Sequence, residues 1–158
     1  MMKTKLLSVF FICIFLNVFT AQTLIKTADF NMDQAAKILK NKGYTIVEKT
    51  DNFIKIKNKE ESVLFIDLDE KKKYLYFNTN ILLKKSASIE KIEALMLEIN
   101  DLNMIKVKFS EKQKSVIFQY FYWITESFTE ESFVDAVLEF YLYQGDSYGL
   151  DKEKLFEY

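Results

Sequence analysis

The chain has 158 residues, which suits one domain of ordinary size rather than two. Apolar residues make up 49% and charged residues 28%, a balance typical of folded proteins, and the formal net charge of −1 gives no indication of nucleic-acid binding. Histidine and arginine are both absent, which excludes catalysis by an imidazole and the clamping of phosphate by a guanidinium group.

The first 21 residues have the pattern of an export signal. Lys3 and Lys5 precede an apolar run at 6–19, and Ala21 is a small residue at a suitable cleavage point. The run has 14 residues, fewer than the roughly 20 that a membrane-spanning helix needs; a buried helix or an uncleaved anchor is the alternative. We therefore predict a signal peptide at 1–21, a periplasmic or secreted location, and no stable membrane insertion after cleavage.

The mature chain starts with a lead-in at 22–30 that has no clear period. A first helix is predicted at 32–42, because Asn31 suits an N-cap and Gly43 suits the left-handed position after a helix. Short polar connections then separate four strand-like segments, a spacing that is typical of an antiparallel meander. These segments are 44–49, 53–57, 63–68 and 74–77.

Helical spacing of apolar residues returns after Ser88 and predicts a second helix that ends near Asn100. The segments 105–109 and 115–124 are then predicted to form a hairpin. Both faces of 115–124 are largely apolar, so we expect this strand in the middle of a sheet or covered on both sides.

The last predicted helix begins at Thr129. Gly145 and Gly149 are expected to flank a loop, with a further helical turn near the end of a C-terminal tail at 144–158. The predicted element order is therefore α-β-β-β-β-α-β-β-α. This order favours an α+β domain at 31–143, with an antiparallel sheet of about six strands and the helices packed on one face.

Several short matches make the sequence resemble the YbjN family of proposed bacterial sensory transduction regulators. They are a leading helix that ends in Gly43-Tyr44, the segment IEKIEALMLEINDLNMIKVKF at 89–109 with its turn Asn100-Asp101-Leu102-Asn103, and the helix start Thr129-Glu130. The resemblance covers residues 31–143. It implies a fold similar to that of type III secretion chaperones, with helices on one face of a twisted sheet, and no established enzymatic chemistry.

Side chains that carry common catalytic or metal chemistry are scarce. The single cysteine, Cys13, lies in the predicted signal and histidine is absent, which excludes thiol and imidazole catalysis and the usual zinc sites in the mature chain. Carboxylates cluster at Asp67, Asp69 and Glu70, where a charged turn is a better account than a calcium site because the glycine of a calcium loop is missing. We therefore predict no catalytic residue, no cofactor and no metal, in a protein that is not an enzyme.

Aromatic residues are abundant, at 16% of the chain. Alternation along 115–124 places Phe121 and Trp123 on one side, and Phe65 and Tyr76 could join them on the sheet face away from the helices. Burial in the core or at a dimer contact is the simpler account for most of these four residues. The functional account is an aromatic face that binds a peptide, a partner protein or a second copy of the chain.

The sequence leaves two hypotheses on function. The first, which we prefer, is an exported, non-enzymatic domain that binds a protein or peptide, including a homodimer partner, by its sheet face or edge. Export and net negative charge argue against nucleic acid as the ligand. The second is a small-molecule or lipid carrier, or a carboxylate-dependent hydrolase, with its ligand between helices and sheet beside Phe118, Tyr120 and Tyr122.

Overall fold

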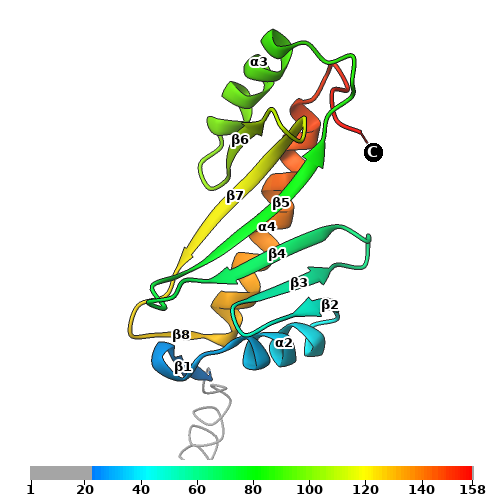
Figure 1. The fold of residues 1–158 in the computed structure, drawn as a ribbon. Coiled ribbons are helices and arrows are strands. Elements are labelled where there is room, and N and C mark those ends of the chain that lie inside the picture. Colours follow the sequence, from blue (N-terminus) through cyan, green and yellow to red (C-terminus); the bar gives the residue numbers. More distant parts are fainter. Residues whose placement is uncertain (1–22, 158) are drawn as a thin grey trace, which may run out of the picture.

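The computed structural model describes residues 23–157, so the signal peptide predicted at 1–21 lies outside the described residues. The described chain forms a six-stranded sheet, a two-stranded sheet and three α-helices, which confirms the predicted α+β class (Figure 1). Its elements, in chain order, are β1 (Leu24–Lys26), a 3₁₀ helix (Thr27–Asp29), α2 (Met32–Asn41), β2 (Thr45–Lys49), β3 (Phe53–Lys57), β4 (Val63–Leu68), β5 (Tyr74–Leu82), α3 (Ile89–Asn100), β6 (Lys106–Ser110), β7 (Ser115–Trp123), β8 (Ser127–Thr129) and α4 (Glu130–Leu150). Within the described range, none of the helices combines the length and the apolar character that crossing a membrane requires.

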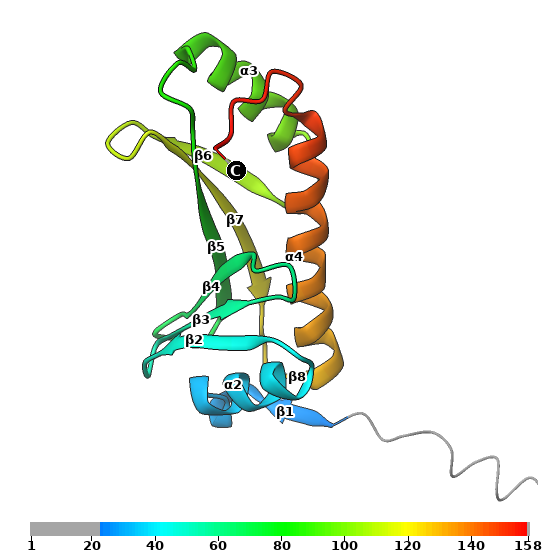
Figure 2. The same ribbon diagram turned by 90° about the vertical axis from the view of Figure 1, so that its right-hand side faces the viewer.

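The strands of the large sheet are ordered β2-β3-β4-β5-β7-β6, and each is antiparallel to its neighbours. The long helix α4 runs along one face of this sheet, while α2 packs beside β2 and α3 beside β6 (Figure 2). Alternate side chains of the strands point toward the helices and form the core. Those that are fully buried include Ile54, Ile56, Leu64, Ile66, Leu75, Phe77, Val116 and Phe118. The opposite face of the sheet is called the outer face below.

Local hydrogen bonds explain where α2 begins and ends. The Asn31 side chain accepts a hydrogen bond from the N–H of Gln34 at 3.0 Å and so caps the first turn, as predicted. Gly43 has a φ of +88°, a backbone conformation that glycine adopts at little cost. Across this turn the N–H of Tyr44 donates to the carbonyl of Leu39 at 3.1 Å. The predicted end of the helix at Gly43 is therefore confirmed.

Helix α4 begins where predicted but continues further. The N–H of Ser132 donates to the Thr129 side chain at 3.1 Å, and the N–H of Thr129 donates to the Ser132 side chain at 3.2 Å. The predicted loop between Gly145 and Gly149 is wrong, because α4 passes through both glycines to Leu150. Packing against the sheet outweighs the low helix propensity of glycine, a long-range effect that the sequence pattern does not carry.

Replacing Gly145 or Gly149 by alanine is expected to raise the free energy of unfolding by about 0.5–1 kcal/mol. Both glycines are exposed, and a Cβ built on either meets no atom within 4 Å. Alanine therefore improves helix propensity without a clash. Urea denaturation of the single variants measures the gain. Gly43→Ala is the control that should lose stability, since its φ of +88° is strained for alanine; a loss of stability at either α4 position would contradict the expectation.

The strand β7 lies between β5 and β6, one strand from the edge of the sheet. β6 pairs only with residues 115–119, whereas β5 pairs along the whole of β7 and extends to Leu82 instead of the predicted Phe77. The expectation of a strand in the middle of the sheet or covered on both sides therefore holds for the first half of β7, which lies between β5 and β6, and not for its second half. The second half of β7 has β5 as its neighbour, and Phe121 and Trp123 on its outer face are 45% and 65% exposed.

Both ends of the described chain are built into the fold. The predicted lead-in contains β1, which pairs with β8, and Phe30, which is fully buried. The segment after α4 makes no further helical turn, contrary to the prediction. Instead, the buried carboxylate of Asp151 accepts hydrogen bonds from the N–H groups of Leu155 and Phe156 at 2.8 and 2.9 Å. Phe156 is thereby held in the core at 0% exposure.

Candidate binding face

An aromatic cluster lies on the outer face where β5 begins and β7 ends. We define it as Tyr74 and Tyr76 of β5 with Phe121 and Trp123 of β7. The centroid of the Tyr74 ring lies 5.3 Å from that of Trp123 and 5.4 Å from that of Phe121. The rings of Tyr76 and Phe121 lie 4.9 Å apart. Because Trp123 and Phe121 remain 65% and 45% exposed, the cluster is a connected aromatic surface that faces solvent.

Strand register brings these four rings together. Tyr74 lies opposite Trp123, and Tyr76 lies opposite Phe121, in the antiparallel pair β5–β7. Opposite residues in such a pair project from the same face of the sheet. Three of the predicted binding residues, Tyr76, Phe121 and Trp123, therefore meet. Sequence reasoning missed Tyr74 as a site residue, although its alternation with Tyr76 was a signal for it.

Phe65, the fourth predicted binding residue, lies on the outer face outside the aromatic cluster. It is half-buried on β4, opposite Asn78 of β5 and Lys55 of β3. The ammonium nitrogen of Lys55 lies 5.1 Å from the centroid of the Phe65 ring, within the range of a cation–π interaction. Phe65 is therefore partly covered by a lysine of the same sheet.

Polar side chains adjoin the aromatic cluster on the outer face. The Asn78 amide donates to the Asp67 carboxylate at 2.8 Å, and the Gln119 amide donates to the Tyr76 hydroxyl. Burial raises the pKa of Asp67 above its ordinary value, and the hydrogen bond from Asn78 partly opposes this rise. Burial also raises the pKa of Tyr76; the hydrogen bond from Gln119 opposes the rise and the charge of Asp67 adds to it. The Tyr76 hydroxyl therefore stays protonated at neutral pH.

Replacing Asp67 by asparagine is expected to stabilise the fold at neutral pH. Because the folded carboxyl has a pKa above the unfolded value of 3.8, wild-type stability falls as pH rises from there through the folded pKa. Asparagine carries no charge and keeps an oxygen that can accept from Asn78. Urea denaturation should show a more stable variant at neutral pH, with the difference vanishing below the unfolded pKa. Asp146→Asn, at an exposed position of α4, is the control, and a less stable Asp67 variant at neutral pH would contradict the expectation.

Two of the three acidic residues singled out as a charged turn, Asp67 and Asp69, make structural hydrogen bonds. The Asp69 carboxylate accepts hydrogen bonds from the N–H groups of Lys71 and Lys73, both at 3.1 Å, and so shapes the turn between β4 and β5. Asp67 bonds Asn78 on the outer face, as described above. In the range 23–157, no three side chains of the histidine, cysteine, aspartate or glutamate types gather closely enough to hold a metal ion.

The space between sheet and helices that a carrier or a hydrolase would use is filled by side chains. Phe118 is fully buried, with its ring 6.0 Å from that of Phe156. The rings of Tyr120 and Tyr122 lie 5.5 and 6.4 Å from the ring of Phe77. Within the described chain, these aromatic rings occupy the space beside the three residues. These contacts therefore give the second functional hypothesis no support at Phe118, Tyr120 and Tyr122.

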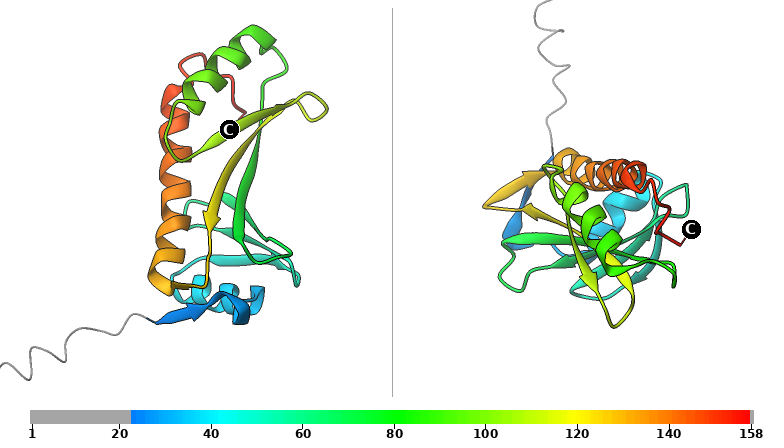
Figure 3. Two further views of the ribbon diagram at one scale, coloured as in Figure 1. Left: turned by 90° about the vertical axis from the view of Figure 1, so that its left-hand side faces the viewer. Right: turned by 90° about the horizontal axis from the view of Figure 1, so that it is seen from above.

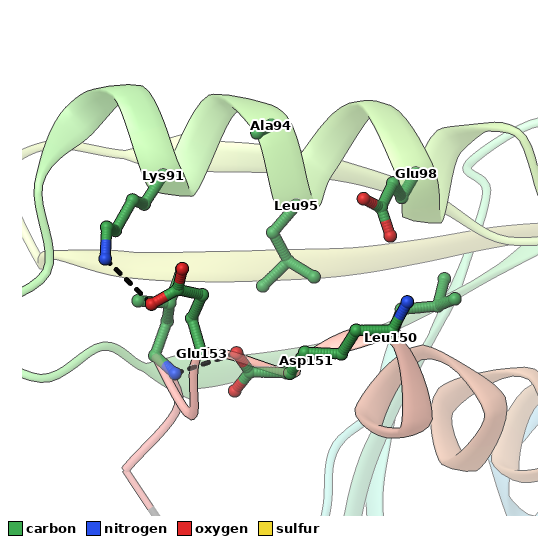
Figure 4. A pocket seen from close by; sticks show the side chains of 9 residues that line it. Lys91, Ala94, Leu95, Glu98, Leu150, Asp151 and Glu153 are labelled. Atoms are coloured by element: carbon green, nitrogen blue, oxygen red, sulfur yellow. Dashed lines mark hydrogen bonds and ion pairs between the residues drawn. The ribbon is translucent and has the colours of Figure 1, made fainter.

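Two concave regions lie away from the outer face. One of about 270 Å³ lies between α3 and the segment after α4, where Leu95 points inward and an exposed ion pair of Lys91 with Glu153, at 2.7 Å, spans the opening (Figure 4). The other, of about 740 Å³, is an open groove beside α4, where the rings of Tyr44 and Tyr141 stack at an interplanar angle of 12°. Exposed ion pairs of this kind contribute little to stability.

The fold is similar to that of a solved structure. The crystal structure of YbjN from E. coli, a proposed transcription regulator, matches with a TM-score of 0.66, and the match covers 80% of this chain and 95% of YbjN at 15% sequence identity. No family model matches the sequence, and no curated protein matches it. At this level of identity the likeness concerns the fold, which supports the YbjN resemblance of the sequence in that respect. The described chain therefore has a YbjN-like fold.

Proposed function

We propose that this protein is an exported, non-enzymatic module that binds a protein or peptide through the outer face of its sheet. The observation that carries the proposal is the exposure of the aromatic cluster, in which Trp123 is 65% exposed while its ring contacts Tyr74. Tryptophan and tyrosine are enriched among the residues that dominate binding energy at protein interfaces. Contiguous exposed apolar surface is also a general mark of interaction sites.

Four further observations support the proposal. The polar groups of Asp67, Asn78 and Gln119 adjoin the aromatic cluster, which matches the usual arrangement of an apolar interface centre with a polar rim. Export is supported by the sequence pattern at 1–21, and a non-enzymatic role by the residue types that the sequence lacks. The fold shared with YbjN, a proposed transcription regulator, is weaker support, since a regulator acts by binding.

A double variant with Phe121→Ala and Trp123→Ala tests the proposal. Envelope proteins captured by the wild-type protein are identified by mass spectrometry, purified, and titrated against both forms. We expect at least about tenfold weaker binding by the variant, because alanine removes two exposed aromatic contacts. The matched control replaces two exposed leucines outside the outer face, Leu97→Ala and Leu142→Ala, which are 70% and 67% exposed. Equal binding by both double variants would refute a role for the aromatic cluster.

A further inference from the structure

The second half of β7 has an open edge. The N–H of Ile124 donates to the carbonyl of Lys73 at 2.9 Å. This hydrogen bond shows that Ile124 directs its backbone groups toward β5, and so do the residues of β7 that alternate with it. In an antiparallel pair these residues alternate, so Phe121 and Trp123 direct their backbone groups to the other side. β6 occupies that side as far as Gln119 and no further. Within residues 23–157, no strand pairs with β7 beyond that point on this side, and Figure 3 shows the bare stretch between β6 and β8.

The outer edges of the same sheet, on β2 and β6, carry features that discourage pairing with a further strand. The open stretch of β7 carries no such feature. β2 has a bulge between Ile46 and Glu48. On β6, the Asn100 side chain accepts from the N–H of Val107 at 2.8 Å and donates to its carbonyl at 3.2 Å, which covers the edge. Bulges, charges and covering groups are the usual protection against strand addition. The stretch 120–123 consists of tyrosine, phenylalanine, tyrosine and tryptophan, with no charged residue.

An acidic flank of α4 lies on the inner side of this open edge. The Tyr120 hydroxyl donates to the Glu139 carboxylate at 3.5 Å, and the negative charge of Asp135 contributes to a raised pKa of Tyr122. Glu131, Asp135 and Glu139 are exposed and spaced four residues apart, so they share one flank of the helix. Within the described residues none of the three takes part in a salt bridge, and the sequence has no lysine from Ser115 to Asp151.

We propose that an extended peptide segment of another protein adds as a strand to the β7 edge at Phe121 and Trp123. Its alternate residues would be bulky and apolar on the side of the aromatic cluster, and lysine or arginine on the side of Asp135 and Glu139. Main-chain hydrogen bonds supply affinity in this mode of recognition, and the alternating side chains supply specificity. The inference rests on the proposed function, for which it names the class of partner.

A short synthetic peptide in which lysine and valine alternate is the probe for the intact mature protein. Amide hydrogen exchange followed by NMR should show the amides of Phe121 and Trp123 slowed by at least about tenfold when the peptide is bound, because they become hydrogen-bonded. The fluorescence of Trp123, the single tryptophan of the chain, reports the titration. N-methylation of alternate peptide amides, or replacement of its lysines by glutamate, should weaken binding by at least about tenfold.

Charge variants of the protein provide the matched comparison. Asp135→Asn with Glu139→Gln should weaken binding of the lysine peptide and flatten its salt dependence, since two facing charges are lost. Glu93→Gln with Glu98→Gln, at exposed positions of α3, removes the same charge elsewhere and should leave binding unchanged.

The outcomes separate the two proposals. Unprotected Phe121 and Trp123 amides in the complex, equal binding of the N-methylated peptide, or no binding of the lysine peptide would overturn strand addition. A concentration-dependent dimer that protects these amides without peptide would overturn it as well, in favour of a second copy of the chain. In each case the proposed function is tested separately, by the effect of the double variant Phe121→Ala with Trp123→Ala on the binding of envelope partners.

Discussion

Replacing Phe77 by alanine is expected to lower the free energy of unfolding by about 3–5 kcal/mol. Phe77 is fully buried on β5, and its ring lies 5.5 Å from that of Tyr120, 6.5 Å from that of Phe133 and 6.3 Å from that of Phe140. Alanine leaves a cavity between the sheet and α4 that these rings can fill only in part. The loss therefore combines the transfer free energy of the ring with the cost of the cavity.

Urea denaturation of the Phe77 variant measures this loss, with the slope of the transition compared to the wild type. Phe121→Ala, on the exposed outer face, is the control and should cost much less, because its ring is already 45% exposed. The result also bears on function. A cost below about 1 kcal/mol would show that the site tolerates an empty volume, and would restore the hypothesis of a carrier with its ligand between helices and sheet.

Replacing Phe30 by alanine is expected to have a comparable cost, of about 3–5 kcal/mol. Phe30 is fully buried, and its ring lies 5.0 Å from that of Phe128 in an edge-to-face arrangement and 5.8 Å from that of Phe133. The residue precedes the domain start predicted at 31, so its burial makes the lead-in part of the hydrophobic core. Loss of the ring should weaken the packing of β8 and of the first turn of α4.

Thermal and urea denaturation of Phe30→Ala test this expectation. The matched control is Leu24→Ala, in the same segment but 63% exposed, which should change stability by less than about 0.5 kcal/mol. If the two variants were equally stable, the lead-in would be dispensable for the fold. Deletion of residues 22–30 would then leave a domain that unfolds at the wild-type temperature.

Signals confined to neighbouring residues were sufficient for much of the fold. The N-cap Asn31, the helix starts at Ser88 and Thr129 and the helix end at Gly43 all lie where the sequence predicts them. Each depends on hydrogen bonds or backbone angles within a few residues, so local sequence carries the information. Two predictions failed where the local signal was weak or misleading. The strand β1 was not predicted because it is too short to show a period. The loop at Gly145 and Gly149 was wrongly predicted because glycine ends a helix only where packing does not sustain it.

Most of the aromatic cluster was also accessible from sequence. Alternation along β7 separates the buried side, with Phe118 and Tyr120, from the side of Phe121 and Trp123, and the exposed fractions of these side chains follow that division. Tyr76 joins them because β5 pairs with β7, which follows it in the chain only after α3 and β6, in a register that the hairpin turns do not specify. Phe65 does not reach them, since β4 sets it opposite Asn78 instead of an aromatic residue.

The sequence by itself determined the α+β class, the order of the main elements, their caps and the two faces of β7. These follow from periodicity and hydrogen bonding over short separations in the chain. Only the tertiary structure decided that β6 ends at Gln119, that Asp135 and Glu139 flank the edge left bare, and that the core beside Phe77 is filled. Those features depend on pairing and packing between residues far apart in sequence, for which no local pattern exists.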